Sequence, residues 1–256
     1  MTRIALLSDI HGNLVALDAV LADLALRGPF DHIVVAGDLV WSGPWPAEVV
    51  DRVQAAGAIV IQGNTDAFFA RMPEEAPPGK RQDRFEEHLS WMRERLGEAR
   101  VRYLANLPFS HRISAAPGQD LLVVHANPSD LERDLRATLK DAELDALLLV
   151  DGSEPDWKAL AFGHIHTPYQ RLWRHRLLVD VASVGLPMDG DHRAAYAVLT
   201  WDGNRWAAEH RRVAYAVPEV IHEMLYGGLP RGKHFAERLK QCGYRAPAQQ
   251  ATFVLD

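Results

Sequence analysis

The chain contains a series of short, mostly apolar segments that alternate with helical patterns. The first segment, RIALLS (3–8), is followed by leucines at helical spacing between 14 and 24. The same order recurs after HIVVAG (32–37) and AIVIQG (58–63). Continuous apolar strands that alternate with helices are typical of a parallel-centred sheet covered on both faces. We therefore predict an α/β fold.

Residues 71–110 interrupt this alternation. They combine a Pro-rich loop, PEEAPPGK, with a charged amphipathic stretch of helical character, so we predict a helical insert. We interpret the basic side chains of Lys80, Arg81 and Arg84 as part of a solvated helix face. Alternatively, they could overhang the cleft and hold a phosphate.

The rest of the chain resumes the strand pattern and ends in helices. Helices are expected within about 129–150 and 218–241, and Asp202-Gly203-Asn204 predicts a hairpin turn between the last two strands. The predicted strands cover residues 119–126, 158–166, 176–183, 194–201 and 205–215.

Composition limits the classes of function. The 256 residues suffice for one large α/β domain or two small ones, and a formal net charge of -6 argues against non-specific binding to nucleic acid. A single cysteine, Cys242, can form no internal disulfide, and no segment has the pattern of a membrane span or a secretory leader. We predict a cytoplasmic protein with no membrane partner; a homo-oligomer is compatible with the sequence.

Five of the predicted strands end in residue types that bind metal ions. Because the carboxyl ends of parallel strands form one edge of an α/β sheet, we expect these side chains to lie close together. Each of them alone would fit an ordinary turn or capping role, but their coincidence at one edge favours a ligand set. The candidates are Asp9, His11, Asp38, Asn64, His125, His164 and His166.

The chemistry of this set suits two metal ions. Two carboxylates, one amide oxygen and four imidazoles exceed what one tetrahedral ion needs, but suit two five- or six-coordinate ions that share a carboxylate. Such ion pairs clamp a phosphoryl group and make hydroxide available near neutral pH. Two divalent ions, two aspartates and one hydroxide leave a net charge of about +1, which attracts a phosphate. The predicted reaction is phosphoester hydrolysis.

At these positions the sequence resembles the calcineurin-like metallophosphoesterases. The resemblance extends to 183–199, which is similar to the closing hairpin of the small prokaryotic phosphodiesterase branch, so that nearly the whole chain is covered. It implies a single domain over 1–256, folded as a four-layer αββα sandwich with mixed sheets and a dinuclear site between them. The motifs are DIHGN (9–13), GDLV (37–40), GNTD (63–66), VVHA (123–126) and GHIHTP (163–168).

The resemblance also implies a role for each candidate. Asp38 would bridge the two ions, and Asp38, Asn64 and His125 are the residues expected to act closest to the reaction. Mn²⁺ is the first choice of metal, with Fe, Ni and Zn as alternatives, because mixed nitrogen and oxygen ligands do not decide among them. One ion would be held by Asp9, His11, Asp38 and His166, and the other by Asp38, Asn64, His125 and His164.

Two departures from the family pattern bear on the substrate. Thr65 stands where many members have a histidine that donates a proton to the leaving group, and residues 180–183 replace a common Asn-Pro-Gly-Ser run. The loss of a general acid typically costs about 10² to 10⁴ in rate. We therefore predict a phosphodiesterase that acts on a small phosphoester by attack of a hydroxide bridging two metal ions. The alternatives are a phosphomonoesterase acting on nucleotides or phosphoproteins, and a metal-holding binding protein without activity.

Overall fold

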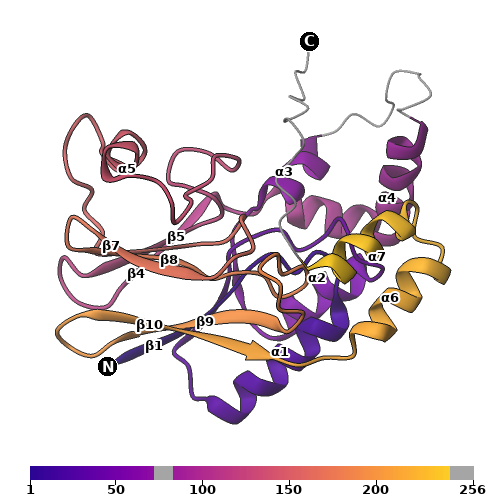
Figure 1. The fold of residues 1–256 in the computed structure, drawn as a ribbon, viewed down its shortest axis with the longest axis horizontal. Helices are drawn as coiled ribbons and strands as arrows, with labels where there is room; N and C mark the ends of the chain where they lie inside the picture. Colours follow the sequence, from indigo (N-terminus) through magenta and orange to yellow (C-terminus); the bar gives the residue numbers. More distant parts are fainter. Residues whose placement is uncertain (72–82, 243–256) are drawn as a thin grey trace.

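Two five-stranded sheets lie face to face, and helices cover their outer faces (Figure 1). The computed structural model describes residues 1–71 and 83–242. The first sheet has the order β10-β9-β1-β2-β3 and the second has the order β4-β5-β6-β8-β7. Figure 1 shows α5 (Asp141–Leu148) above the second sheet and α1 (Leu14–Arg27) below the first. The predicted four-layer αββα sandwich with mixed sheets is confirmed.

Both sheets have a parallel centre. In the first sheet β1, β2 and β3 run in the same direction, and the β9–β10 hairpin adds antiparallel strands beside β1. In the second sheet β5, β6 and β8 are parallel, and β4 and β7 are antiparallel edge strands. The first-sheet strands are β1 (Thr2–Leu7), β2 (His32–Val35), β3 (Ile59–Val60), β9 (Ala194–Trp201) and β10 (Trp206–Val213). The second-sheet strands are β4 (Ser110–Ser114), β5 (Asp120–Val124), β6 (Ala159–Phe162), β7 (Tyr169–Trp173) and β8 (Arg176–Asp180).

Strand β1 shows how the sequence builds the layers. Ile4 and Leu6 belong to the apolar cluster between the two sheets, whereas Ala5 and Leu7 pack into the cluster under α1. This alternation follows from the two-residue period of a strand, and both faces are apolar because both are covered. Burial of each large aliphatic side chain contributes about 1.5–3 kcal/mol to stability.

The predicted helix after the first strand is confirmed as α1. The side chain of Asn13 caps this helix by accepting a hydrogen bond from Ala16 N at 3.1 Å. The predicted C-terminal helices are confirmed as well. The other helices in the described part of the chain are α2 (Pro46–Ala55), α3 (Asn64–Arg71), α4 (Asp83–Ala105), α6 (Val217–Tyr226) and α7 (Gly232–Gln241).

The structure corrects several predicted boundaries. Strand β4 begins at Ser110, where the sequence predicted the end of a helical insert, and β7 was not predicted. Both are edge strands with partly exposed, polar faces, so they lack the continuous apolar character of the central strands. Between residues 129 and 150 the only helix is α5, and β3 is limited to Ile59 and Val60.

Helix α4 lies within the segment that the sequence predicted as a helical insert. Helix α4 packs against α2 and α3, and Gly97 interrupts it with a left-handed φ of 66°. Residues 72–82, and with them Lys80 and Arg81, lie outside the described residues, as does the side chain of Arg84. None of the helices within 1–71 and 83–242 combines the length and apolar character needed to cross a membrane.

His88 is a buried histidine that ties α4 to the loop after β2. Its Nε2–H donates to the carbonyl oxygen of Trp41 at 2.7 Å, and its Nδ1 is buried without a hydrogen-bond partner in the described part of the chain. Burial lowers the pKa of His88 to about 4. The folded protein therefore holds the neutral imidazole.

We expect this histidine to destabilise the fold in mild acid. Because its pKa is lower in the folded than in the unfolded state, the unfolded state binds the proton first as the pH falls below about 6.5. Between pH 7 and pH 5 the wild type should lose about 2 kcal/mol more unfolding free energy than His88→Gln, which keeps an N–H donor but does not titrate. Urea denaturation at both pH values measures the difference, and parallel losses in the two proteins would contradict it.

Candidate metal centre

The seven predicted candidates all follow strands at one edge of the sandwich. Asp9 and His11 come after β1, Asp38 after β2 and Asn64 after β3, all in the first sheet. In the second sheet His125 follows β5, and His164 and His166 follow β6. The side chains form two groups, and within each group the possible ligand atoms all lie within 4.8 Å of one another. One group consists of Asp9, His11 and His166, and the other of Asp9, Asp38 and His125.

The first group brings two imidazoles and a carboxylate together. Nε2 of His166 lies 3.1 Å from Oδ1 of Asp9 and 3.2 Å from Nε2 of His11. The Nδ1 atoms of both rings bond to backbone carbonyl oxygens, His11 to Val40 at 3.3 Å and His166 to Leu186 at 2.5 Å. A neutral imidazole that donates from Nδ1 carries a lone pair on Nε2. Three lone-pair atoms therefore converge at this point.

A second convergence lies beside Asp38. His125 donates from Nδ1 to the carbonyl oxygen of Ala36 at 2.7 Å, which leaves a lone pair on its Nε2. That Nε2 lies 2.9 Å from Oδ1 of Asn64 and 3.5 Å from Oδ1 of Asp38. With His125 in this tautomer, three acceptor atoms lie close together: its Nε2, Oδ1 of Asn64 and Oδ1 of Asp38. A cation between them would satisfy all three.

His164 is placed differently from the other candidates. Its Nε2 lies 2.9 Å from the carbonyl oxygen of Glu132 and 3.2 Å from Oδ1 of Asp134. Its ring centroid is 5.1 Å from that of His125, so the residue borders the second group without belonging to it. Among the described residues its Nδ1 has no hydrogen-bond partner, which makes Nδ1 the nitrogen free to bind a metal. Its assignment as a ligand stays a prediction.

The electrostatics of the centre also fit a cation. Burial raises the pKa of Asp38 to about 7, and the nearby charge of Asp9 adds to that effect. Burial lowers the pKa of His11 to about 3, so its ring is neutral at pH 7. Oδ1 of Asp9 is buried and accepts no hydrogen bond from the described residues.

Much of the centre is held in a strained backbone conformation. Five of the seven candidates have a left-handed φ: Asp9 (54°), His11 (50°), Asp38 (55°), His164 (71°) and His166 (57°). For residues other than glycine this conformation costs about 1 kcal/mol or more each, and it persists only where the surrounding structure imposes it. Such strain is common where side chains must be aimed at a ligand.

Two glycines leave room for the candidate carboxylates. A Cβ at Gly63 would lie 2.1 Å from Oδ1 of Asp38, and a Cβ at Gly163 would lie 2.4 Å from Oδ2 of Asp9. Real Cβ atoms do not approach oxygen so closely. The glycines of the GNTD and GHIH motifs are therefore required for the two aspartates to occupy these positions.

Sequence reasoning missed two residues that support the centre. Oδ1 of Asp66 accepts a hydrogen bond from Leu39 N, and Oδ2 accepts from Asp38 N and Gly63 N. The sequence signal for this residue is its place in GNTD, two positions after Asn64. No sequence signal marks Asp134, whose contact with His164 arises from the fold of the loop after β5.

Comparison with known proteins gives the family. The sequence matches the family model of the calcineurin-like phosphoesterases over residues 2–181, which includes all the candidate residues. The chain belongs to the calcineurin-like phosphoesterase family. Membership in this metallophosphoesterase family implies divalent metal ions, in agreement with the converging ligand atoms.

Similar proteins come from archaea and bacteria. An uncharacterized protein of Methanocaldococcus jannaschii is 27% identical over 251 residues, which cover 90% of this phosphoesterase and 94% of the relative. The crystal structure of a metallophosphoesterase from Sphaerobacter thermophilus is similar with a TM-score of 0.73 and 26% identity, and the likeness covers 94% of this chain and 99% of that one. A hypothetical protein from Pyrococcus horikoshii shares the fold with a TM-score of 0.78, at 22% identity over 95% and 99% of the two chains.

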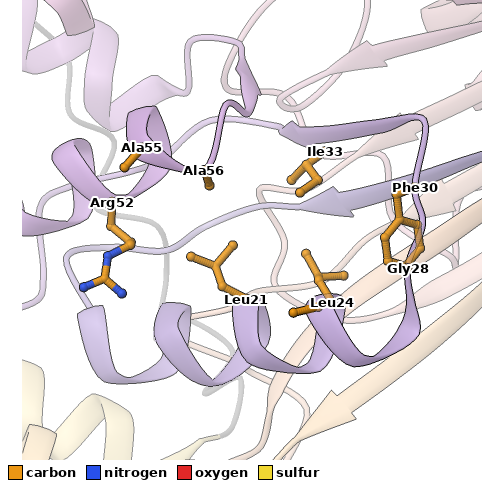
Figure 2. A pocket seen from close by; sticks show the side chains of 9 residues that line it. Leu21, Leu24, Gly28, Phe30, Ile33, Arg52, Ala55 and Ala56 are labelled. Carbon is orange, nitrogen blue, oxygen red and sulfur yellow. The ribbon is translucent and has the colours of Figure 1, made fainter.

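A separate apolar pocket lies away from this centre (Figure 2). It has a volume of about 420 Å³ and is lined by Leu21 and Leu24 of α1, Phe30, Ile33 and the end of α2. None of the seven candidates lines it, and its lining includes Gly28 and Phe30, which precede β2, and Ala55 and Ala56, which precede β3. The pocket is therefore distinct from the candidate metal centre.

Proposed function

We propose that this calcineurin-like phosphoesterase hydrolyses phosphodiesters with the help of two divalent metal ions. The observation that carries the proposal is the meeting of lone-pair atoms at Asp9, His11 and His166, and again at Asn64 and His125. Acceptor atoms placed at 2.9–3.2 Å from one another without a shared proton are unfavourable unless a cation lies between them.

Asp9 belongs to both groups of ligand atoms, and Asp38 is the carboxylate that we propose to bridge the two ions. Oδ2 of Asp38 lies 3.7 Å from Nε2 of His11, and Oδ1 lies 3.5 Å from Nε2 of His125, so its two oxygens point towards different groups. When bound, two divalent ions supply a nucleophile from water near neutral pH and neutralise charge on the phosphoryl group. The protein's own residues hold these ions, and Asn64 does so without adding negative charge. We propose Mn²⁺ as the native ion.

The surroundings of Thr65 support a preference for diesters. Its hydroxyl donates to the carbonyl oxygen of Val40 at 3.2 Å, and its backbone N–H donates to Oδ1 of Asp38 at 2.9 Å. A hydroxyl does not give up its proton near neutral pH, so this position offers no general acid to a leaving group. Esters whose leaving group needs little protonation are then the favoured substrates, as with an aryl diester.

We expect activity to require bound metal and to favour the diester. Wild-type protein dialysed against a chelator should lose at least about 10²-fold in its rate on bis-p-nitrophenyl phosphate and recover it on addition of Mn²⁺. With Mn²⁺, kcat/KM for this diester should exceed that for p-nitrophenyl phosphate. Both rates are followed by release of nitrophenolate. A higher value for the monoester would favour the phosphomonoesterase alternative, and bound metal without turnover of either ester would refute catalysis.

A further inference from the structure

The loop between β5 and α5 contacts two of the seven candidate ligands directly. The carbonyl oxygen of Glu132 lies 2.9 Å from Nε2 of His164, and Oδ1 of Asp134 lies 3.2 Å from the same nitrogen. The side chain of Glu132 also reaches Asn64, with 3.5 Å between Oε2 and Nδ2. In the proposed centre one ion, here called the second ion, is held by Asp38, Asn64, His125 and His164. The loop therefore touches ligands of the second ion.

These contacts decide which ring nitrogen of His164 can bind a metal. A carbonyl oxygen only accepts hydrogen bonds, so Nε2 of His164 carries the hydrogen and Nδ1 carries the lone pair. The pattern is the reverse of that in His11, His125 and His166, whose Nδ1 atoms bond to carbonyl oxygens. His164 thus offers the opposite nitrogen, and the loop after β5 selects it.

Hydrogen bonds within the loop fix the backbone from which Asp134 extends. The side chain of Asn127 is buried, accepts from Asp130 N at 3.0 Å and donates to Arg133 O at 2.9 Å. Asp130 accepts in turn from Glu132 N at 2.8 Å and from Arg133 N at 2.7 Å. Leu135, on the other side of Asp134, is buried in the apolar cluster that includes residues of α5. Asp134 is therefore held between two anchored positions.

The carboxylate of Asp134 has a separate partner for each oxygen. Oδ2 pairs with Arg136, and Oδ1 faces Nε2 of His164. A carboxylate that accepts from the far N–H of a metal-binding imidazole fixes the tautomer and the ring orientation, and makes the other nitrogen a stronger ligand. Loss of such a partner typically weakens metal binding about 10- to 100-fold.

We propose that Asp134 is a positioning residue for the second ion. Together with the carbonyl oxygen of Glu132, its carboxylate holds the Nε2–H of His164 and leaves Nδ1 for the metal. The inference rests on the proposed two-ion function and assigns control of one ion to the loop after β5. His11 and His166, which would hold the first ion, are fixed instead by carbonyl oxygens of Val40 and Leu186. Loss of Asp134 should therefore spare the first ion.

Metal binding tests this role independently of turnover. Protein freed of metal by a chelator is titrated with Mn²⁺ in a calorimeter. We expect the wild type to bind two ions and Asp134→Ala to lose about tenfold or more in affinity for one of them only. Asp134→Asn keeps an acceptor oxygen without the charge and should bind that ion with intermediate affinity. Asp156→Ala is the matched control, because Asp156 also pairs with an arginine, Arg112 at 2.8 Å, but precedes β6 instead of following it.

The first ion serves as the internal standard. A variant whose fold is generally disturbed would bind both ions more weakly, so weaker binding of both ions to Asp134→Ala would overturn the positioning role. Unchanged binding of both ions would overturn it as well.

The Mn²⁺ dependence of hydrolysis provides a second measurement. The Mn²⁺ concentration that gives half the maximal rate on bis-p-nitrophenyl phosphate should rise about tenfold in Asp134→Ala and stay at the wild-type value in Asp156→Ala. An unchanged concentration in Asp134→Ala would contradict the inference. A wild type that binds fewer than two ions would refute the two-ion centre and the role of Asp134 with it. Binding of two ions without hydrolysis would refute the proposed catalysis alone.

Discussion

Substitution of Asp38 by asparagine should lower kcat/KM for bis-p-nitrophenyl phosphate by about 10³-fold or more, because its two oxygens face imidazoles of different ligand groups. Its two oxygens lie 3.7 Å from Nε2 of His11 and 3.5 Å from Nε2 of His125. Asparagine replaces one oxygen by an NH₂ group, whose hydrogens cannot bind a cation, and removes a negative charge. One of the two ions then loses a ligand whichever way the amide is turned.

Metal content is the measurement that links this loss of activity to the centre. Elemental analysis should give about two ions per chain for the wild type and fewer for Asp38→Asn, since each metal site depends on ligand charge and number. Asp31→Asn is a matched control, because Asp31 is exposed and accepts a hydrogen bond from Arg3 N, ahead of β2 rather than after it. It should keep both metal and activity. Equal rates for wild type and Asp38→Asn would refute the proposed role of Asp38.

The parts of the fold that were predictable are those governed by local rules. The central strands could be recognised because both their faces are buried, which makes them continuously apolar, as in RIALLS. Within each sheet, the edge at which the polar ends gather follows from parallel pairing, but the meeting of the two edges depends on how the two sheets pack together. The confirmed start of α1 rests on the same kind of evidence, since an asparagine directly before an apolar helical pattern is a common cap.

What the sequence did not reveal depends on contacts between distant segments. Strands β4 and β7 pair at the sheet edges although their residues are half polar, and only the neighbouring strand determines that they are extended. The choice between the two ring nitrogens of His11 and His125 is set by carbonyl oxygens 29 and 89 residues away along the chain. The left-handed backbone of Asp9 and Asp38 is likewise imposed by the assembled fold, because local preference opposes it.

Asp66 is the residue whose loss should most reduce the stability of the region around the metal centre. Its side chain is fully buried and accepts hydrogen bonds from Asp38 N at 2.8 Å and from Leu39 N and Gly63 N at 3.0 Å each. Asp66→Ala leaves three buried N–H groups without an acceptor. At about 1–3 kcal/mol for each unsatisfied group, we expect a loss of about 4 kcal/mol in unfolding free energy.

The same change should reduce activity, because the backbone bonds to Asp66 position Asp38 and the turn before Asn64. Urea denaturation of the metal-free proteins measures the change in unfolding free energy separately from any change in metal binding. Asp66→Asn retains one acceptor oxygen and should fall between the wild type and Asp66→Ala.

Asp202→Ala is the matched control for this prediction. Asp202 also accepts two backbone hydrogen bonds, from Asn204 N at 2.8 Å and Arg205 N at 2.9 Å, but in an exposed hairpin turn. Water can replace its carboxylate there, so its removal should cost less than about 1 kcal/mol. If Asp66→Ala and Asp202→Ala lost the same unfolding free energy, the N–H groups around Asp66 would have to be satisfied by water or relaxation. Packing, rather than the hydrogen bonds of Asp66, would then hold Asp38 beside the turn that follows β3.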